Sequence, residues 1–88
     1  LNNNLRLQDS DSLQLGNSQD LEIYHASGNS NIDNKVGHLY IRANVGSDTG
    51  SNIYIQAKSG ENSIICNDDG SVNLYYNNSA KLWLLRIW

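Results

Sequence analysis

The stretch DLEIYHASG (residues 20–28) alternates apolar and polar side chains and then ends in turn-forming residues. Similar short phrases return as HLYIR (residues 38–42) and NIYIQ (residues 52–56). An apolar residue at every second position is typical of a β-strand, because successive side chains of a strand point to opposite faces. The three phrases therefore predict short strands that recur along the chain.

The triplet apolar–x–apolar in fact occurs eight times, beginning at residues 5, 13, 21, 39, 53, 64, 72 and 82. Ile32, in the longest gap between triplets, is the candidate for a ninth and weaker element. Clusters of Gly, Asn, Asp and Ser separate the triplets, and these residues favour turns. No segment keeps a helical period, and Asn, Ser and Gly are poor helix formers. The sequence predicts an all-β fold.

The composition leaves little material for a core. The 88 residues are 39% hydrophobic and 17% charged, with no Phe, Met or Pro, and 14 Asn and 11 Ser. Ordinary domains have about 45–50% apolar and 25% charged residues. Each predicted strand offers about two inward side chains, so a lone chain has a thin core and open sheet edges. We expect an intertwined homotrimer, a β-helix or β-prism fibre; a single-chain β-solenoid or a small sandwich remain as alternatives.

The residues expected at the core or on the trimer axis are the outer members of the first seven triplets. They are Leu5, Leu7, Leu13, Leu15, Leu21, Ile23, Leu39, Ile41, Ile53, Ile55, Ile64, Cys66, Val72 and Leu74. Ile55→Asp is expected to prevent assembly, because it would place unpaired carboxylates near the axis. Gln56→Ala, on the other side of the same strand, is expected to be nearly neutral.

Longer segments of the chain are similar to a known tract in order and spacing. They are LRLQDSDSLQLG (residues 5–16), DLEIYH (20–25), GNSNI (28–32), GHLYI (37–41) and DGSVNLYYNNSAKL (69–82). Together they resemble a recurring tract in structural proteins of tailed phages that infect marine cyanobacteria. The resemblance covers about residues 5 to 82. The tract has an acidic turn residue where this chain has Ala26-Ser27, and it turns polar and Thr-rich where this chain continues as WLLRIW (residues 83–88).

The resemblance implies a virion protein, a fibre or tail-associated segment that forms a shaft or a host-contacting tip. Such segments are usually homotrimers, and the resemblance brings no enzymatic activity. The point at which the chain departs from the tract divides it into a repetitive β fibre module, residues 1–82, and a hydrophobic C-terminal segment, residues 83–88. That segment contains both tryptophans, Trp83 and Trp88, and is a candidate cap on one end of the trimer.

Several other classes of function find no support in the residues. No nucleophile stands with a base, and the adjacent carboxylates Asp68-Asp69, next to Gly70, most simply form a tight turn, so we expect no enzyme and no cofactor. The net charge is −3 and the basic residues are scattered, which argues against a nucleic-acid partner. No apolar run is long enough to span a bilayer, so membrane insertion is not expected. Cys66 is the single cysteine and, among apolar neighbours, is expected to be a small buried hydrophobe.

Two residue types could still bind a ligand. His25 is in phase with Leu21 and Ile23, so three copies could meet on a trimer axis and bind a metal, although a buried or turn-exposed histidine is the simpler expectation. The tyrosines that alternate away from the apolar pairs should lie outside; they are Tyr24, Tyr40, Tyr54 and Tyr75. Exposed aromatic rings can stack on sugars, so a receptor-binding module that recognises host cell-surface glycans is the alternative function. Cross-strand packing that shields the backbone is the simpler role for these rings.

Overall fold

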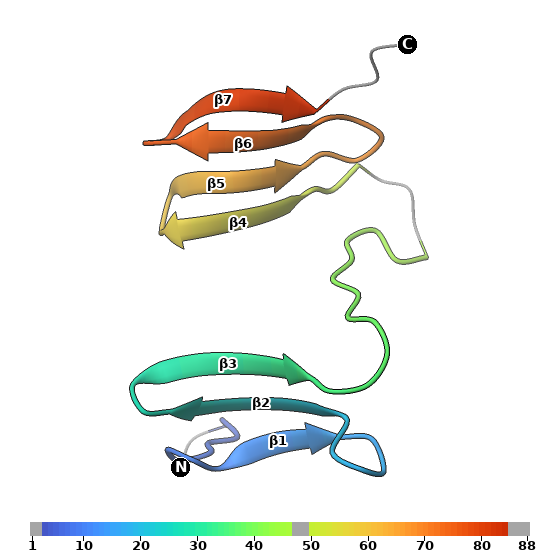
Figure 1. The fold of residues 1–88 in the computed structure, drawn as a ribbon, viewed down its shortest axis with the longest axis vertical. Coiled ribbons are helices and arrows are strands. Elements are labelled where there is room, and N and C mark those ends of the chain that lie inside the picture. The colour runs from blue at the N-terminus through green and yellow to red at the C-terminus, as the bar shows by residue number, and fades with distance from the viewer. Residues whose placement is uncertain (1–2, 47–49, 85–88) are drawn as a thin grey trace. The chain divides into compact units, whose positions relative to one another are not determined.

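The computed structural model describes residues 3–46 and 50–84, with the side chain of Leu84 excepted. This part of the chain contains seven strands and no helix. The strands form two antiparallel sheets, one of three strands and one of four (Figure 1). The all-β prediction is confirmed. The chain divides after Tyr40 into two compact units, each of which contains one sheet.

The first sheet is a meander of β1 (Ser12–Leu15), β2 (Leu21–Ala26) and β3 (Asn29–Asn34). Strands β2 and β3 are joined by the two-residue turn Ser27-Gly28, and both residues have positive φ, 54° and 79°. Positive φ at both positions is the backbone of a type I′ turn, whose twist matches that of the strands it joins. The serine-glycine pair therefore fixes the register in which Ile23 lies opposite Ile32.

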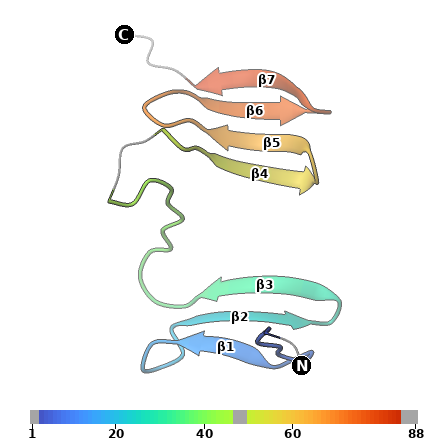
Figure 2. The same cartoon turned by 180° about the vertical axis from the view of Figure 1, so that it is seen from behind.

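The second sheet is a four-stranded meander. Its strands are β4 (Ile53–Lys58), β5 (Glu61–Cys66), β6 (Val72–Tyr76) and β7 (Ser79–Leu84). They lie side by side in sequence order, seen from both sides in Figures 1 and 2. The β6–β7 turn, Asn77-Asn78, again has positive φ at both residues, 50° and 60°.

Consecutive strands are hydrogen-bonded neighbours in both sheets, and every pair is antiparallel. In a β-solenoid each strand would instead lie beside the corresponding strand of the next coil. The meander connectivity of the described residues is therefore not that of the single-chain β-solenoid. It arises because the short turn clusters return each strand directly onto its predecessor.

The strand prediction holds at six of the eight triplets and fails at two. Ile32 lies in β3, so the ninth and weaker element is present. Residues 5–7 and 39–41 form no strand. A strand requires a neighbour whose backbone groups complete the ladder. The segment that contains residues 5–7 is hydrogen-bonded to β2 only at Ser10, whose N–H donates to the carbonyl oxygen of His25 at 2.9 Å.

The C-terminal boundary expected between residues 82 and 83 falls within a strand. Strand β7 continues through Trp83 to Leu84, and Trp83 is paired with Asn73 of β6. Residues 85–88, the rest of the expected cap, lie outside the described residues.

Candidate functional site

One face of the first sheet is aliphatic. Leu13, Ile23 and Ile32 form a row across the three strands, and Leu15 pairs with Leu21 in the next row. Alternation places the two rows on the same side of the sheet. All of these side chains except Leu21 are exposed, with Ile32 at 61%. The described residues of its own unit leave this face uncovered.

The second sheet repeats this pattern on a larger scale. One row contains Ile53, Cys66 and Val72, and the next contains Ile55, Ile64, Leu74 and Leu82. Its inner strands shield one another, so Ile64 and Leu74 are half-buried. On the edge strands β4 and β7, Ile55 and Leu82 are 49% and 47% exposed. We call these two surfaces, one on each sheet, the aliphatic faces.

The predicted core residues are therefore brought together in rows but are not enclosed. Eight of the fourteen are exposed in the chain, including Leu5 at 84%. Ile65 is the sole buried hydrophobic residue in the described ranges, at 7% exposure. It is the middle residue of its triplet, which alternation places opposite the aliphatic face. Its burial follows from its place on an inner strand, between Tyr54 of β4 and Asn73 of β6.

The opposite face of the first sheet is polar and internally hydrogen-bonded. Glu22, at the centre of the sheet, accepts hydrogen bonds from Ser12, Gln14 and Lys35. The Lys35 ammonium and then the Gln14 amide stabilise its charged form, so the pKa of Glu22 is lowered. This arrangement satisfies the carboxylate within the sheet.

Tyr24 belongs to the same polar face. Its hydroxyl donates to the Asp33 carboxylate at 2.6 Å. That hydrogen bond stabilises the neutral phenol and raises the pKa of Tyr24. Since its hydroxyl is already engaged, Tyr24 has a structural role in the described chain.

The other predicted tyrosines lie in different settings. Tyr40 makes an edge-to-face contact with His38, with ring centroids 6.3 Å apart. Tyr54 is 55% exposed and Tyr75 is half-buried, and both lie on the face of the second sheet that is opposite its aliphatic face. Trp83 lies in the same cross-strand row as Tyr54. The sequence analysis assigned Trp83 to a cap at the end of the trimer and did not predict this pairing. Its pairing with β6 could have been inferred from the Asn-Asn turn.

His25 belongs to no group of potential metal ligands within the described residues. It lies opposite Ser30 at the end of β2, is exposed, and its Nδ1 is 2.9 Å from the Ser30 hydroxyl. Across residues 3–46 and 50–84, no three His, Cys, Asp or Glu side chains gather where they could hold a metal ion. Asp68-Asp69, next to Gly70, forms a tight turn closed by a hydrogen bond from the Gly70 N–H to the Asn67 carbonyl oxygen.

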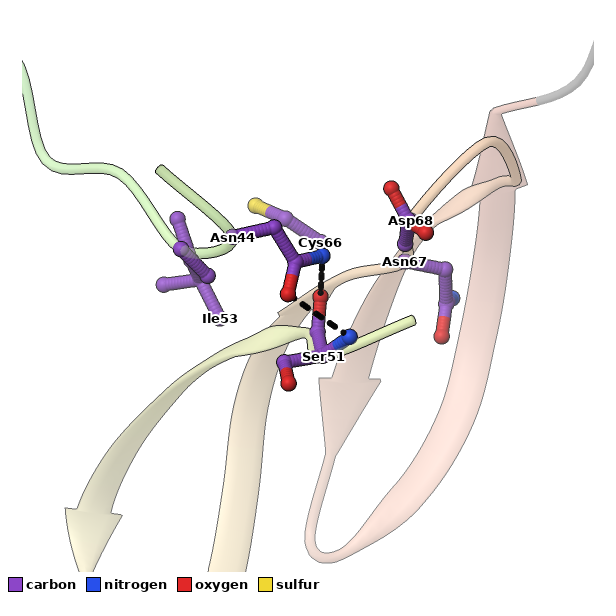
Figure 3. A pocket seen from close by; sticks show the side chains of 7 residues that line it. Asn44, Ser51, Ile53, Cys66, Asn67 and Asp68 are labelled. Carbon is purple, nitrogen blue, oxygen red and sulfur yellow. Dashed lines mark hydrogen bonds between the residues drawn. The ribbon is translucent and has the colours of Figure 1, made fainter. Parts of the chain in front are cut away.

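Cys66 lines a small open pocket of about 170 Å³ at the start of the second sheet (Figure 3). The Asn44 side chain closes one side by pairing with both backbone groups of Ser51, at 2.9 and 3.1 Å. Ile53, Asn67 and Asp68 complete the labelled lining. Cys66 is half-buried here rather than enclosed, because the pocket opens beside it. The lining is mostly amide and aliphatic, and it does not form a catalytic constellation.

Comparison with protein-family models, with curated proteins and with solved structures found no match to this chain. Within the described residues there is also no helix of the length and apolarity that crossing a bilayer requires. The candidate functional surfaces are therefore defined by the geometry of the two sheets alone.

Proposed function

We propose that the chain is a non-enzymatic structural segment of a phage virion fibre, and that it acts as a homotrimer. The observation that carries the proposal is the pair of uncovered aliphatic faces. Sheets with one aliphatic face and nothing to cover it normally occur where another surface packs against them. The aliphatic face of another copy of the same chain is such a surface, so no second kind of protein is required.

The form of the sheets favours a β-prism over strands that wind around one another. Each meander completes its internal ladders within one chain, so three copies could each provide one wall. The aliphatic faces would point to the common axis and the hydrogen-bonded face of Glu22 and Tyr24 would point outward. The triplets at residues 5–7 and 39–41 would gain strand partners from a neighbouring copy.

The association with a virion rests on the order and spacing of the segments between residues 5 and 82, which resemble the phage tract. A short repeated strand suits a shaft, because the cross-section of a fibre repeats along its length. In this role the chain transmits shape and rigidity and needs no cofactor, nucleic acid or membrane.

Immunogold labelling of intact virions of the phage that encodes this chain tests the location. An antibody against residues 50–84 should label fibres or tail appendages in electron micrographs. Label confined to the capsid shell, or the absence of the chain from purified virions by mass spectrometry, would contradict the proposal.

A further inference from the structure

The second sheet has an aromatic face opposite its aliphatic one. Tyr54, Ile65, Asn73 and Trp83 form one row across β4, β5, β6 and β7. Tyr75 lies two residues beyond Asn73 on the same side of β6. Tyr54 and Trp83, on the two edge strands, are 55% and 53% exposed. We call this surface, defined by Tyr54, Tyr75 and Trp83 around Ile65 and Asn73, the aromatic face.

The polar atoms of the three rings are unused within the described part of the chain. The Tyr54 hydroxyl, the Tyr75 hydroxyl and the Trp83 indole N–H make no hydrogen bond to a described residue. Tyr24 differs, because its hydroxyl is fully engaged by Asp33. The aromatic face thus combines exposed rings with free hydrogen-bonding groups, whereas the polar face of the first sheet satisfies itself.

The row also carries no charged side chain. Its members are aromatic, aliphatic or amide, and Asn73 uses its Oδ1 to accept from the Ser71 hydroxyl, which fixes the orientation of the amide. The exposed Lys81 lies two residues before Trp83 on β7, so a charged group is close to the row although none belongs to it. The row itself offers flat apolar rings beside neutral donors and acceptors, which suit a ligand with apolar C–H faces and hydroxyl groups.

We propose that the aromatic face binds a neutral oligosaccharide laid across the four strands. Tyr54 and Trp83 are three strand spacings apart, roughly 14 Å, so the two rings would contact different sugar units of one chain. Tyr75 lies between these edges and would donate or accept through its hydroxyl. A second protein copy is the less suitable occupant, because the aliphatic face on the other side already provides the surface for self-association.

Calorimetric titration of the intact chain with chitohexaose, mannohexaose and laminarihexaose tests the proposal, with hexagalacturonate as a charged comparison. Saturable binding to at least one neutral probe is expected. Tyr54→Ala and Trp83→Ala should each weaken it at least tenfold. Tyr54→Phe, which keeps the ring, should weaken it less than Tyr54→Ala does. Tyr76→Phe, on the other side of β6, is the matched control and should bind as the original chain does.

Three results would overturn the proposal: no binding to any of the three neutral probes, binding only to hexagalacturonate, or binding that Tyr54→Ala and Trp83→Ala leave unchanged. Tyr54→Phe and Trp83→Phe decide the question if the alanine variants do not fold, as judged by circular dichroism. Light-scattering masses of all variants, taken in parallel, separate a loss of binding from a loss of assembly. The two proposals are therefore tested separately: the saccharide site can be refuted while the fibre role stands, and the fibre role can be refuted while the saccharide site stands.

Discussion

Truncation of Ile55 should weaken the proposed homotrimer while leaving the strand itself intact. Fully burying an isoleucine side chain contributes about 1.5–3 kcal/mol. Ile55 is 49% exposed in the single chain, so covering its remaining surface contributes about 0.7–1.5 kcal/mol per copy. Three copies give about 2–4 kcal/mol, which Ile55→Ala would largely remove. The three-chain dissociation constant should rise about 30- to 700-fold, as measured by sedimentation equilibrium over a concentration series.

The control for this experiment has to avoid Gln56. Its side chain donates to the Asn62 Oδ1 at 2.8 Å and accepts from the Gly60 N–H at 3.0 Å, so it braces the β4–β5 turn. Because of these hydrogen bonds we expect a stability cost for Gln56→Ala, in place of the nearly neutral effect expected from the sequence. Lys58→Ala is the better control, because Lys58 makes only an exposed ion pair with Glu61 at 3.3 Å. Equal effects of Ile55→Ala and Lys58→Ala would refute the reasoning, as would an Ile55→Asp variant that assembles normally.

Three further predictions concern the sheets themselves. The folded-state pKa of Glu22 is lowered, so its contribution to stability is present above its unfolded pKa and is lost as the pH falls through the folded-state pKa. The melting temperature should therefore decrease when the pH is lowered below about 4. Glu22→Gln should make the melting temperature less dependent on pH in this range. Gln56→Ala should cost about 0.5–1.5 kcal/mol in urea unfolding, through its lost turn hydrogen bonds. Gly28→Ala should lower the free energy of unfolding by about 1–2 kcal/mol. Gly28 has a φ of 79° and a Cβ there would meet no atom within 4 Å, so the substitution adds only backbone strain. A Gly28→Ala variant as stable as the original would contradict the type I′ assignment.

The alternation in the sequence predicts most of the strands and the faces on which their side chains lie. Six of the eight triplets lie in strands, and their apolar members line one side of each sheet. The period of a strand is two, so the assignment of side chains to faces follows once the strand is recognised. The glycine- and asparagine-rich clusters likewise predicted turns, because Gly and Asn tolerate positive φ.

Pairing could not be predicted from the triplets alone. Leu5-Arg-Leu7 has the same pattern as Leu13-Gln-Leu15, yet only the second has a partner strand, and no local feature distinguishes them. Nor could alternation identify Ile65 as the buried residue, because its burial depends on neighbours from two other strands. The aromatic face could not be predicted either, because it depends on neighbours from other strands. Trp83 joins Tyr54 only through the registers of three successive strand pairs.

The most direct test of the account is the molar mass of the folded chain in solution. Multi-angle light scattering coupled to size exclusion, at micromolar concentration, should give three times the chain mass of 9.8 kDa. Circular dichroism of the same fraction should show β-structure that is lost together with the trimer on dilution. A monomer of 9.8 kDa that keeps its β-structure at micromolar concentration would contradict the claim that the aliphatic faces are covered by other copies of the chain.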